Sequence, residues 1–320
     1  MKIVNPFADF RHPRLDANEG LVFSRQLQQV SAVVNRHVYP ALKARSFIPP
    51  QPDGADPLAT SYNYMDMQKS GATKAGSQRN NSAPLVNLFM SENESKIRDV
   101  TAGYEWTQLE IQRAARAGVA LNPEKAIACR EIIETEINSI LLVGDASLAI
   151  PGLLDATNGI ATAAVPNGAG GFPQWSTKTS AEILLDVEQI LTAAFSASQG
   201  SVSTFVLAVP PTEWGQLATT RLDNTQQTTL MAYMMDRLPM LSDVVWLPEL
   251  ATSGAGGTGE MILAPSGPGA SAAFHAVIPE EYTEAPPFVR HWATEIAAAA
   301  RCGGTIVRKP FQLLRRSAIA

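Results

Sequence analysis

Four histidines are the first residues to test for chemistry, since histidine is the commonest metal ligand and general base. They are His12, His37, His275 and His291. Their spacing fits neither the His-Glu-x-x-His arrangement of a zinc peptidase nor the ligand pairs of a structural zinc site. We therefore expect structural or surface histidines and no metal site.

Nucleophiles and phosphate-binding loops are the next candidates. Ser198, Ser201 and Ser203 lie at a predicted helix-to-strand junction without the Gly-x-Ser-x-Gly turn of a hydrolase, so turn chemistry accounts for them. Two glycine clusters resemble phosphate cradles: Gly168, Gly170 and Gly171, and Gly254, Gly256, Gly257 and Gly259. Neither is followed by Lys-Ser/Thr or opens a helix after a strand, which predicts plain loops and no bound cofactor.

Carboxylates and thiols complete the search for a reactive site. The acidic pairs are Glu280 with Glu281 and Asp53 with Asp56. Both pairs lie in stretches broken by proline or glycine, where we expect solvated side chains. Cys129 and Cys302 are far apart in sequence, which predicts two reduced thiols, Cys129 in the core. The sequence thus predicts no catalytic, cofactor-binding or metal residue, and hence not an enzyme.

One basic cluster resembles a nucleic-acid-binding stripe. It consists of Arg308, Lys309, Arg315 and Arg316 around Phe311. Cations beside an aromatic ring suit phosphate contact and base stacking. On an acidic chain we expect these residues to pack within their own domain, or to touch phosphate weakly and without sequence preference.

Composition and charge bound the class of protein. The 320 residues are 45% hydrophobic, enough for a sizeable core, and contain no apolar run near the ~20 residues of a membrane span. Residues 1–10 lack the layout of a signal peptide, so we expect no membrane partner and a cytosolic site of synthesis. Charge is segregated: residues 1–130 carry 16 Lys and Arg against 12 Asp and Glu, residues 131–290 carry 4 against 17, and residues 291–320 carry 5 against 1. Solubility of the acidic middle and complementarity between copies both explain this pattern.

Two capped helices occupy the stretch from Gly103 to Gly144. The first begins at a capping box, Thr107 to Glu110, and ends at Gly118; the second begins with Asn122 as N-cap. An apolar stripe follows the second helix: Ala126, Cys129, Ile133, Ile137, Ile140 and Leu141. At the usual rise, this spine helix spans roughly 30 Å.

An extended arm precedes these helices. A modest helical pattern covers residues 21–42, and residues 49–84 are too rich in proline and glycine for a core. Alternation in Thr60–Met67 and a returning strand at Leu85–Met90 predict a long hairpin. With ~17 residues per arm it would reach some 50 to 60 Å, and an isolated hairpin is marginal in water, so a partner must stabilise it.

The middle of the chain, residues 148–285, has an α+β pattern. A second capping box, Thr179 to Glu182, opens a helix that ends at Gly200. Further elements are expected as a strand at 204–209, a helix at 228–238, strands at 244–247, 260–263 and 272–278, and a strand at 305–308. Residues 292–300 are rich in alanine and fit either a helix or a strand.

The order of these parts resembles that of the major capsid proteins of tailed bacteriophages, with their Hong Kong 97-type fold. More narrowly, the chain is similar to a capsid family formerly catalogued as a domain of unknown function. The matching residues are Gly103-Tyr104, Glu110, Asn138, Gly152-Leu153-Leu154, Gly303-Gly304, Val307 and Pro310. They run in order along most of the chain, from about Thr60 to Pro310.

The resemblance implies an α+β capsid fold with four parts: an N-terminal arm (1–48), an E-loop hairpin (49–95), a P-domain with the spine helix (96–147 and 286–320) and an A-domain (148–285). It implies hexamers and pentamers that form an icosahedral shell around the viral genome, located in the virion and assembled in the host bacterial cytoplasm. The implied partners are other copies of the chain, portal and scaffolding or decoration proteins, and packaged double-stranded DNA, bound without specificity.

Two other functions remain open. A bacterial encapsulin-like nanocompartment has the same fold, and protein cargo instead of DNA inside the particles would favour it. An oligomeric α+β enzyme lacks support because no constellation of reactive residues is found. If the hairpin is an assembly arm, deleting residues 51–81 leaves a folded A-domain and abolishes closed shells.

Overall fold

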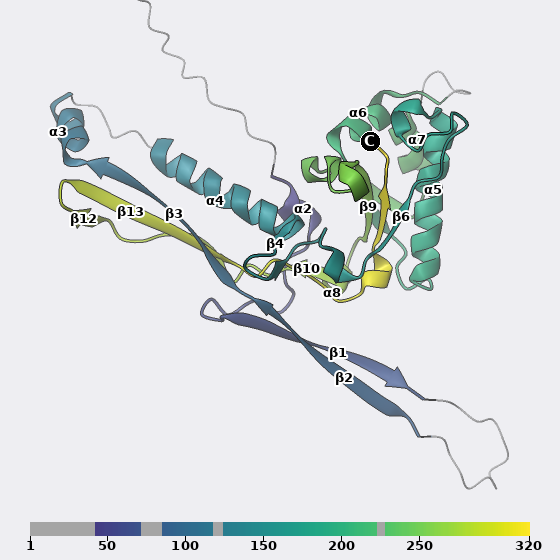
Figure 1. The fold of residues 1–320 in the computed structure, drawn as a ribbon, viewed down its shortest axis with the longest axis horizontal. Helices are drawn as coiled ribbons and strands as arrows, with labels where there is room; N and C mark the ends of the chain where they lie inside the picture. The colour runs from purple at the N-terminus through teal and green to yellow at the C-terminus, as the bar shows by residue number, and fades with distance from the viewer. Residues whose placement is uncertain (1–41, 72–84, 118–123, 223–227) are drawn as a thin grey trace, which may run out of the picture. The chain divides into compact units, whose positions relative to one another are not determined.

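The chain divides into two units, Met1–Pro40 and Ala41–Ala320. The computed structural model describes residues 42–71, 85–117, 124–222 and 228–320, all within the second unit (Figure 1). The helices are α2 (Ala44–Phe47), α3 (Gln108–Ala117), α4 (Glu124–Leu142), α5 (Ser180–Ala197), α6 (Pro211–Thr219), α7 (Leu230–Arg237) and α8 (Ala270–Ala273). The strands are β1 (Ser61–Ser70), β2 (Asn87–Lys96), β3 (Arg98–Thr107), β4 (Gly144–Asp145), β5 (Ile150–Pro151), β6 (Ala161–Ala164), β7 (Phe205–Val209), β8 (Leu241–Trp246), β9 (Glu260–Pro265), β10 (Phe274–Ala276), β11 (Glu280–Glu284), β12 (Phe288–Arg290), β13 (Ala293–Cys302), β14 (Thr305–Val307) and β15 (Leu314–Ser317). The helical pattern expected in residues 21–42 lies almost wholly outside the described residues.

The expected hairpin is confirmed by the antiparallel pairing of β1 with β2. Ser61 lies opposite Lys96 and Ser70 opposite Asn87. The return strand begins at Asn87, two residues later than expected. Its ten residues span ~33 Å at the usual rise. The remainder of the expected reach depends on residues 72–84, outside the described residues.

A long antiparallel ribbon is formed by β3 and β13, which pair from Arg98 opposite Cys302 to Thr107 opposite Ala293. β11 and β12 pair with the other edge of β13. The alanine-rich stretch that fitted either helix or strand is therefore a strand. Alanine favours helix locally, but ladder partners on both edges of β13 outweigh that preference. No local pattern predicted β3.

The expected spine helix is α4, which Figure 1 shows lying along the β3–β13 ribbon. Its buried residues are Cys129, Ile133, Ile137, Asn138, Ile140, Leu141 and Leu142, which confirms the predicted apolar stripe except for the half-buried Ala126. The chain leaves the helix through Gly144, whose φ of 83° is a conformation that favours glycine. The predicted cap at Asn122 lies outside the described residues.

The turn after α4 explains why glycine occupies position 152. Here the chain folds back on the helix end, and the Leu153 amide donates to the Leu141 carbonyl at 2.9 Å. A Cβ on Gly152 would collide with the backbone of Val143 and Gly144. Any other residue at position 152 would push the segment after β5 away from the end of the spine helix.

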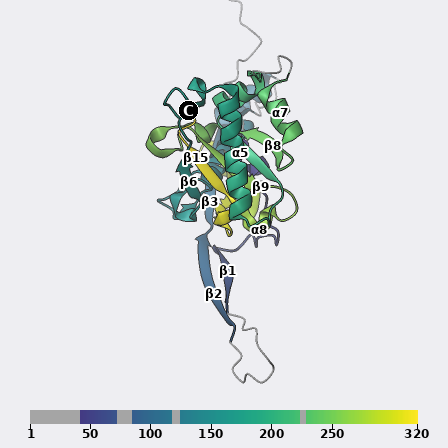
Figure 2. The ribbon, with the colours of Figure 1, turned by 90° about the vertical axis from the view of Figure 1, so that its right-hand side faces the viewer.

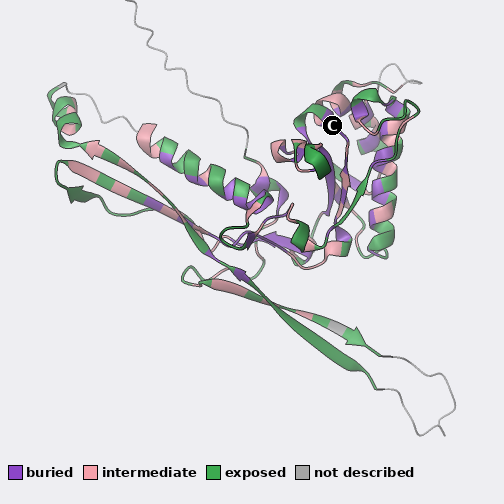
Figure 3. Cartoon of the chain, viewed as in Figure 1, coloured by how far each residue is buried: buried purple, intermediate pink, exposed green. Residues whose placement is uncertain are grey.

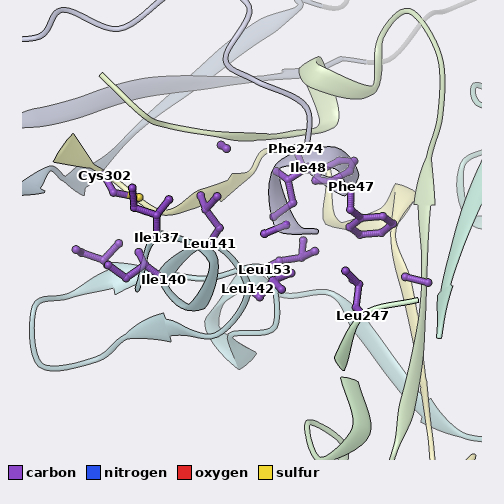
Figure 4. Close-up of a cluster of buried hydrophobic side chains, with 14 of the residues drawn as sticks. Phe47, Ile48, Ile137, Ile140, Leu141, Leu142, Leu153, Leu247, Phe274 and Cys302 are labelled. Atoms are coloured by element: carbon purple, nitrogen blue, oxygen red, sulfur yellow. The ribbon is translucent and has the colours of Figure 1, made fainter. Parts of the chain in front are cut away.

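A hydrophobic core joins the spine helix to the rest of the unit, and Figure 4 shows part of it. Phe47 and Ile48, at the end of α2, pack with Ile137 and Leu141 of α4 and with Phe274 of β10. The rings of Phe47 and Phe274 lie 6.2 Å apart, centroid to centroid. The segment that follows the N-terminal unit is thus anchored in this core.

A five-stranded sheet forms the centre of the acidic middle domain, in the order β6-β15-β9-β7-β8. Figure 2 shows α5 lying across its strands. The predicted capping box of α5 is confirmed, with Thr179 and Glu182 bonded reciprocally. β15, within the segment 286–320 expected to join the spine, instead pairs with β6 and β9 in this sheet.

Smaller elements differ from expectation for local reasons. The predicted helix at 228–238 is α7, capped by Thr229. Pro210 and Pro211 do end β7, but Pro211 also opens the unexpected α6, because proline suits the first helical position. Residues 272–278, expected as one strand, form the end of α8, the short strand β10 and two residues outside regular structure.

Candidate assembly surfaces

The hairpin carries an exposed apolar face. Because side chains alternate across a strand, Met65, Met67, Leu88 and Met90 share one face of the β1–β2 ladder. All are exposed, Met67 by 53% and Met90 by 68%, and Figure 3 shows β2 almost wholly exposed. Lys69 and Glu92 lie on the same face, opposite Leu88 and Met65, so the exposed apolar side chains are bordered by charge, as at the rim of a contact site. Methionine suits one that must adapt to its partner.

The root of the hairpin, in contrast, is bonded to its own chain. Ser95 donates its hydroxyl hydrogen bond to the Gly303 carbonyl at 2.9 Å, and Ile97 bonds through its amide to Thr60. Ile97 also packs in a small core with Val277 and Ile306. The hairpin is therefore attached to the rest of the chain at its root, and the methionine face further out is exposed.

A second exposed apolar patch lies at the turn from β12 to β13. Phe288, Val289 and Trp292 are exposed, Trp292 by 79%. The Trp292 carbonyl accepts the Gln108 amide at 2.6 Å, which ties this turn to the start of α3. Trp292, Leu109 and Gln112 are among the residues that line a cavity of about 740 Å³ here. This end of the ribbon offers both a protruding indole and a recess.

The capping box predicted at Thr107 is present and stabilises the same end of the ribbon. The Thr107 amide donates to Glu110 Oε2 at 3.0 Å, and the Glu110 amide to the Thr107 hydroxyl at 3.3 Å. These bonds from Thr107, helped by Lys125, lower the pKa of the Glu110 carboxyl. Lys125 Nζ also donates to the Glu105 carbonyl and lies over the Trp106 ring. α4 is thereby linked to β3 and α3.

Polar contacts clamp α2, where the described residues begin. Asn138 of the spine helix accepts the Ala44 amide at 2.9 Å through Oδ1 and donates to Glu249 Oε1 at 2.5 Å. Arg45 forms ion pairs with Glu134 at 3.2 Å and Glu281 at 2.6 Å. α2 is thus bonded to α4 and to β11, and Asn138 bonds α4 to the segment after β8.

The candidate histidines and serines are not brought together. His275 is fully buried in β10, whereas His291 is exposed with a φ of 52°; His12 and His37 lie outside the described residues. Ser198 donates to the Phe195 carbonyl within its turn, Ser201 accepts from the distant Gln312, and Ser203 is exposed. Turn chemistry is confirmed for Ser198.

The two glycine clusters are loops, as expected. Gly168 bonds to the Phe172 carbonyl through its amide in one tight turn. In the other, the Gly254 amide bonds to the Thr258 carbonyl, with Gly256 at a φ of 76°. Neither turn leads directly into an α-helix: a 3-10 turn, Trp175–Thr177, separates the first from α5, and β9 follows the second.

The acidic pairs have local partners. Glu281 pairs with Arg45, Glu280 accepts the Thr283 hydroxyl at 3.1 Å, and Asp56 accepts the Leu58 amide at 3.0 Å. Among the described residues no group of three or more histidine, cysteine or acidic side chains is placed to hold a metal ion. Both cysteines are buried free thiols, and burial raises the pKa of Cys302 to about 11.

Two arginines of the basic C-terminal cluster bond to other parts of the same chain, the hairpin and β9. Arg315 is buried and pairs with Glu260, and Arg308 donates to the Tyr62 hydroxyl. Phe311 is half exposed. Arg308 and Arg315 are therefore engaged within the chain, whereas Lys309 and Arg316 are half-buried. No described helix is long and apolar enough to cross a membrane.

Comparison with known proteins identifies the family. A family model described as "Major capsid protein" matches residues 71–319, most of the chain. The chain therefore belongs to the major capsid protein family. It is thus a structural protein whose copies associate into a capsid shell. No curated protein matches the sequence.

Solved capsids share the fold. The capsid of Myoviridae phage XM1 is 15% identical with a TM-score of 0.77, and the match covers 92% of this chain and 98% of that one. The capsid of a native GTA particle is 13% identical with a TM-score of 0.63, covering 96% and 100%. A virus-like particle from Pyrococcus furiosus is 12% identical with a TM-score of 0.56, covering 85% and 91%. These likenesses establish the α+β Hong Kong 97-type capsid fold, and the family match favours the capsid over the encapsulin and enzyme alternatives.

Proposed function

We propose that copies of this chain assemble into hexamers and pentamers that tile an icosahedral head around packaged double-stranded DNA. The observation that carries the proposal is the methionine face of the hairpin, formed by Met65, Met67, Leu88 and Met90. This face is exposed although its root is bonded to the body, so the apolar surface is presented and not folded away. A second copy of the chain is the partner that is present wherever the protein is made.

The four-part division gives each surface a role. The hairpin (49–95) lies over the P-domain (96–147 and 286–320) of a neighbouring copy, and the A-domain (148–285) gathers around each capsomer axis. The pairing of β15 with β6 and β9 supports adding residues 314–317 to the A-domain.

Further partners follow from the same role. We infer contacts with portal and scaffolding or decoration proteins, and assembly in the host bacterial cytoplasm. Contact with DNA is non-specific, because Arg315 and Arg308 are engaged within the chain. The protein acts by contact and not by catalysis.

Particle formation tests the proposal. Met67→Glu together with Met90→Glu places two charges on the apolar face, and we expect capsomers or monomers in size-exclusion chromatography and negative-stain microscopy. Asn87→Glu adds a charge to the opposite face of the same hairpin and should leave closed shells intact. If the double variant forms normal shells, the methionine face is not part of the interface between copies. If the chain without residues 51–81 forms normal shells, the hairpin is not needed for assembly.

The contents of the particles test the enclosed cargo. Purified heads from infected cells should contain double-stranded DNA that is protected from nuclease. Particles filled with a co-purifying enzyme and lacking DNA would overturn the viral role and favour a nanocompartment.

A further inference from the structure

The root of the hairpin closes over a buried histidine. The rings of Tyr62, on β1, and His275, on β10, meet edge to face with their centroids 6.0 Å apart. Arg308 Nη2 donates to the Tyr62 hydroxyl at 2.8 Å, and the guanidinium carbon lies 5.5 Å from the centre of the Tyr64 ring. The imidazole therefore lies between the first residues of the hairpin and the strands that hold it.

The hydrogen bonds of His275 leave one ring nitrogen bare. Nδ1 lies 3.0 Å from the Ser271 carbonyl oxygen, which only accepts, so Nδ1 carries a proton. Nε2 is buried and has no hydrogen-bond partner among the described residues. In the neutral ring Nε2 is an unprotonated acceptor, whereas in the cation it becomes a buried N–H without an acceptor.

The charges that face the ring oppose its protonation. Arg308 lies on the β14 side, and its own Nε is buried without a partner among the described residues. Asp53, on the segment before β1, is exposed and acts in the opposite direction. The Tyr62 ring of β1, the Ser271 carbonyl on α8 and Ile306, its partner on β14, also contact or pair with His275. Burial, then Arg308, lower the pKa of His275 from its ordinary value of 6.5, against the Ser271 bond and Asp53.

We propose that His275 is an acid-sensitive latch of the hairpin: the neutral ring lets Tyr62 and Arg308 close the root, and protonation opens it. A protonated His275 would be a buried cation near the Arg308 guanidinium. Its Nε2–H would be a buried donor without an acceptor among the described residues. Opening the root exposes the ring to water and weakens the repulsion between the ring and the Arg308 guanidinium. The hairpin would then change its direction relative to the strands that hold it.

The direction of the pH effect follows from linkage. When the root is closed the pKa of His275 is below 6.5, and when it is open the ring titrates near 6.5. The closed root is fully stable above the open-state value, weakens as the pH falls through the window between the two values, and levels off below it. Each unit between the two pKa values raises the opening equilibrium about tenfold.

Hydrogen exchange measured by mass spectrometry on the full-length, unassembled chain tests the latch. The reporters are the Ile97 amide, bonded to Thr60, and the Val277 amide, bonded to Gly304. After correction for intrinsic exchange, we expect the opening of both to increase as the pH falls from about 7.5 to about 5. The ladder between β7 and β9 should not respond.

The key variant is His275→Asn, because an amide can still donate to the Ser271 carbonyl but does not titrate. It should abolish the acid response, whereas His291→Asn, at an exposed histidine, should retain it. An unchanged response in His275→Asn, or no response in the wild type, would overturn the latch. If His275→Asn does not fold, the imidazole resonance of His275 in the wild type decides, since its titration and the opening must share one midpoint. No shell is needed, so failure here leaves the proposed assembly untouched.

Discussion

Arg315 and Glu260 form a bidentate ion pair on adjacent strands of the five-stranded sheet. Arg315 Nη2 lies 2.7 Å from Glu260 Oε1, and Nε lies 3.2 Å from Oε2. The Glu260 side chain is fully buried and that of Arg315 is 9% exposed. Arg315 also donates to the Leu154 carbonyl at 2.8 Å, so the pair bonds β9, β15 and the segment after β5 together.

Removing one partner of this pair should be strongly destabilising. Arg315→Met leaves a buried carboxylate without its counter-ion, and we expect a loss of about 3–5 kcal/mol in the free energy of unfolding. Urea denaturation of the unassembled chain measures it. The double variant Glu260→Met/Arg315→Met should recover part of the loss, because no charge then remains buried. If Arg315→Met unfolds at the same urea concentration as the wild type, the pair does not stabilise the sheet.

The spine helix should tolerate side-chain truncation on its exposed face but not on its buried face. Ile137→Ala creates a cavity in the core between α4 and the ribbon, and we expect a loss of about 2–5 kcal/mol in unfolding free energy. Ile132, on the same helix, is 62% exposed, and Ile132→Ala should change stability by less than about 0.5 kcal/mol. Chemical denaturation compares the two. Equal losses would mean that the buried face of α4 is misassigned.

The clamp on α2 should protect the start of the described unit from proteolysis. Asn138→Ala removes the acceptor of the Ala44 amide and the donor to Glu249, at a cost of about 1–3 kcal/mol for groups left unpaired. Trypsin should then cleave faster after Lys43 and Arg45. Ser139→Ala, at the next, exposed position, is the matched control. Cleavage at the wild-type rate in Asn138→Ala would show that other contacts secure α2.

The capping box of α5 should make stability depend on acid. Glu182 accepts the Ala169 amide at 2.6 Å and the Thr179 amide at 2.9 Å, and these bonds lower the pKa of the carboxyl in the folded chain. This stabilisation is present above the unfolded pKa, about 4.3, and is lost as the pH falls through the lower folded value. The stability difference between the wild type and Glu182→Gln should therefore shrink on acidification. A difference that is constant in urea titrations from about pH 6 to about pH 3 would contradict this.

Local signals in the sequence predicted the elements whose stability is local. The capping boxes at Thr107 and Thr179 are present, and the apolar stripe from Cys129 to Leu141 is the buried face of α4. Each signal depends on side chains within one or two turns of helix, so neighbours in sequence suffice. The order of arm, hairpin and spine helix also carried the resemblance that the family match confirmed.

Residue types and their spacing by themselves determined the class of elements, the lack of a motif for chemistry and the capsid family. Tertiary structure alone decided which distant segments pair. The alanines of β13 became a strand because β3 and β11 pair with them, and Arg315 became a core residue because Glu260 lies on the next strand. His275 Nε2 is buried without a hydrogen-bond partner among the described residues, beside Tyr62 and its bond to Arg308. Such contacts join residues that are tens to hundreds of positions apart in the sequence. Their stabilising free energy depends on neighbours that only the folded chain brings together, so no local pattern predicts them.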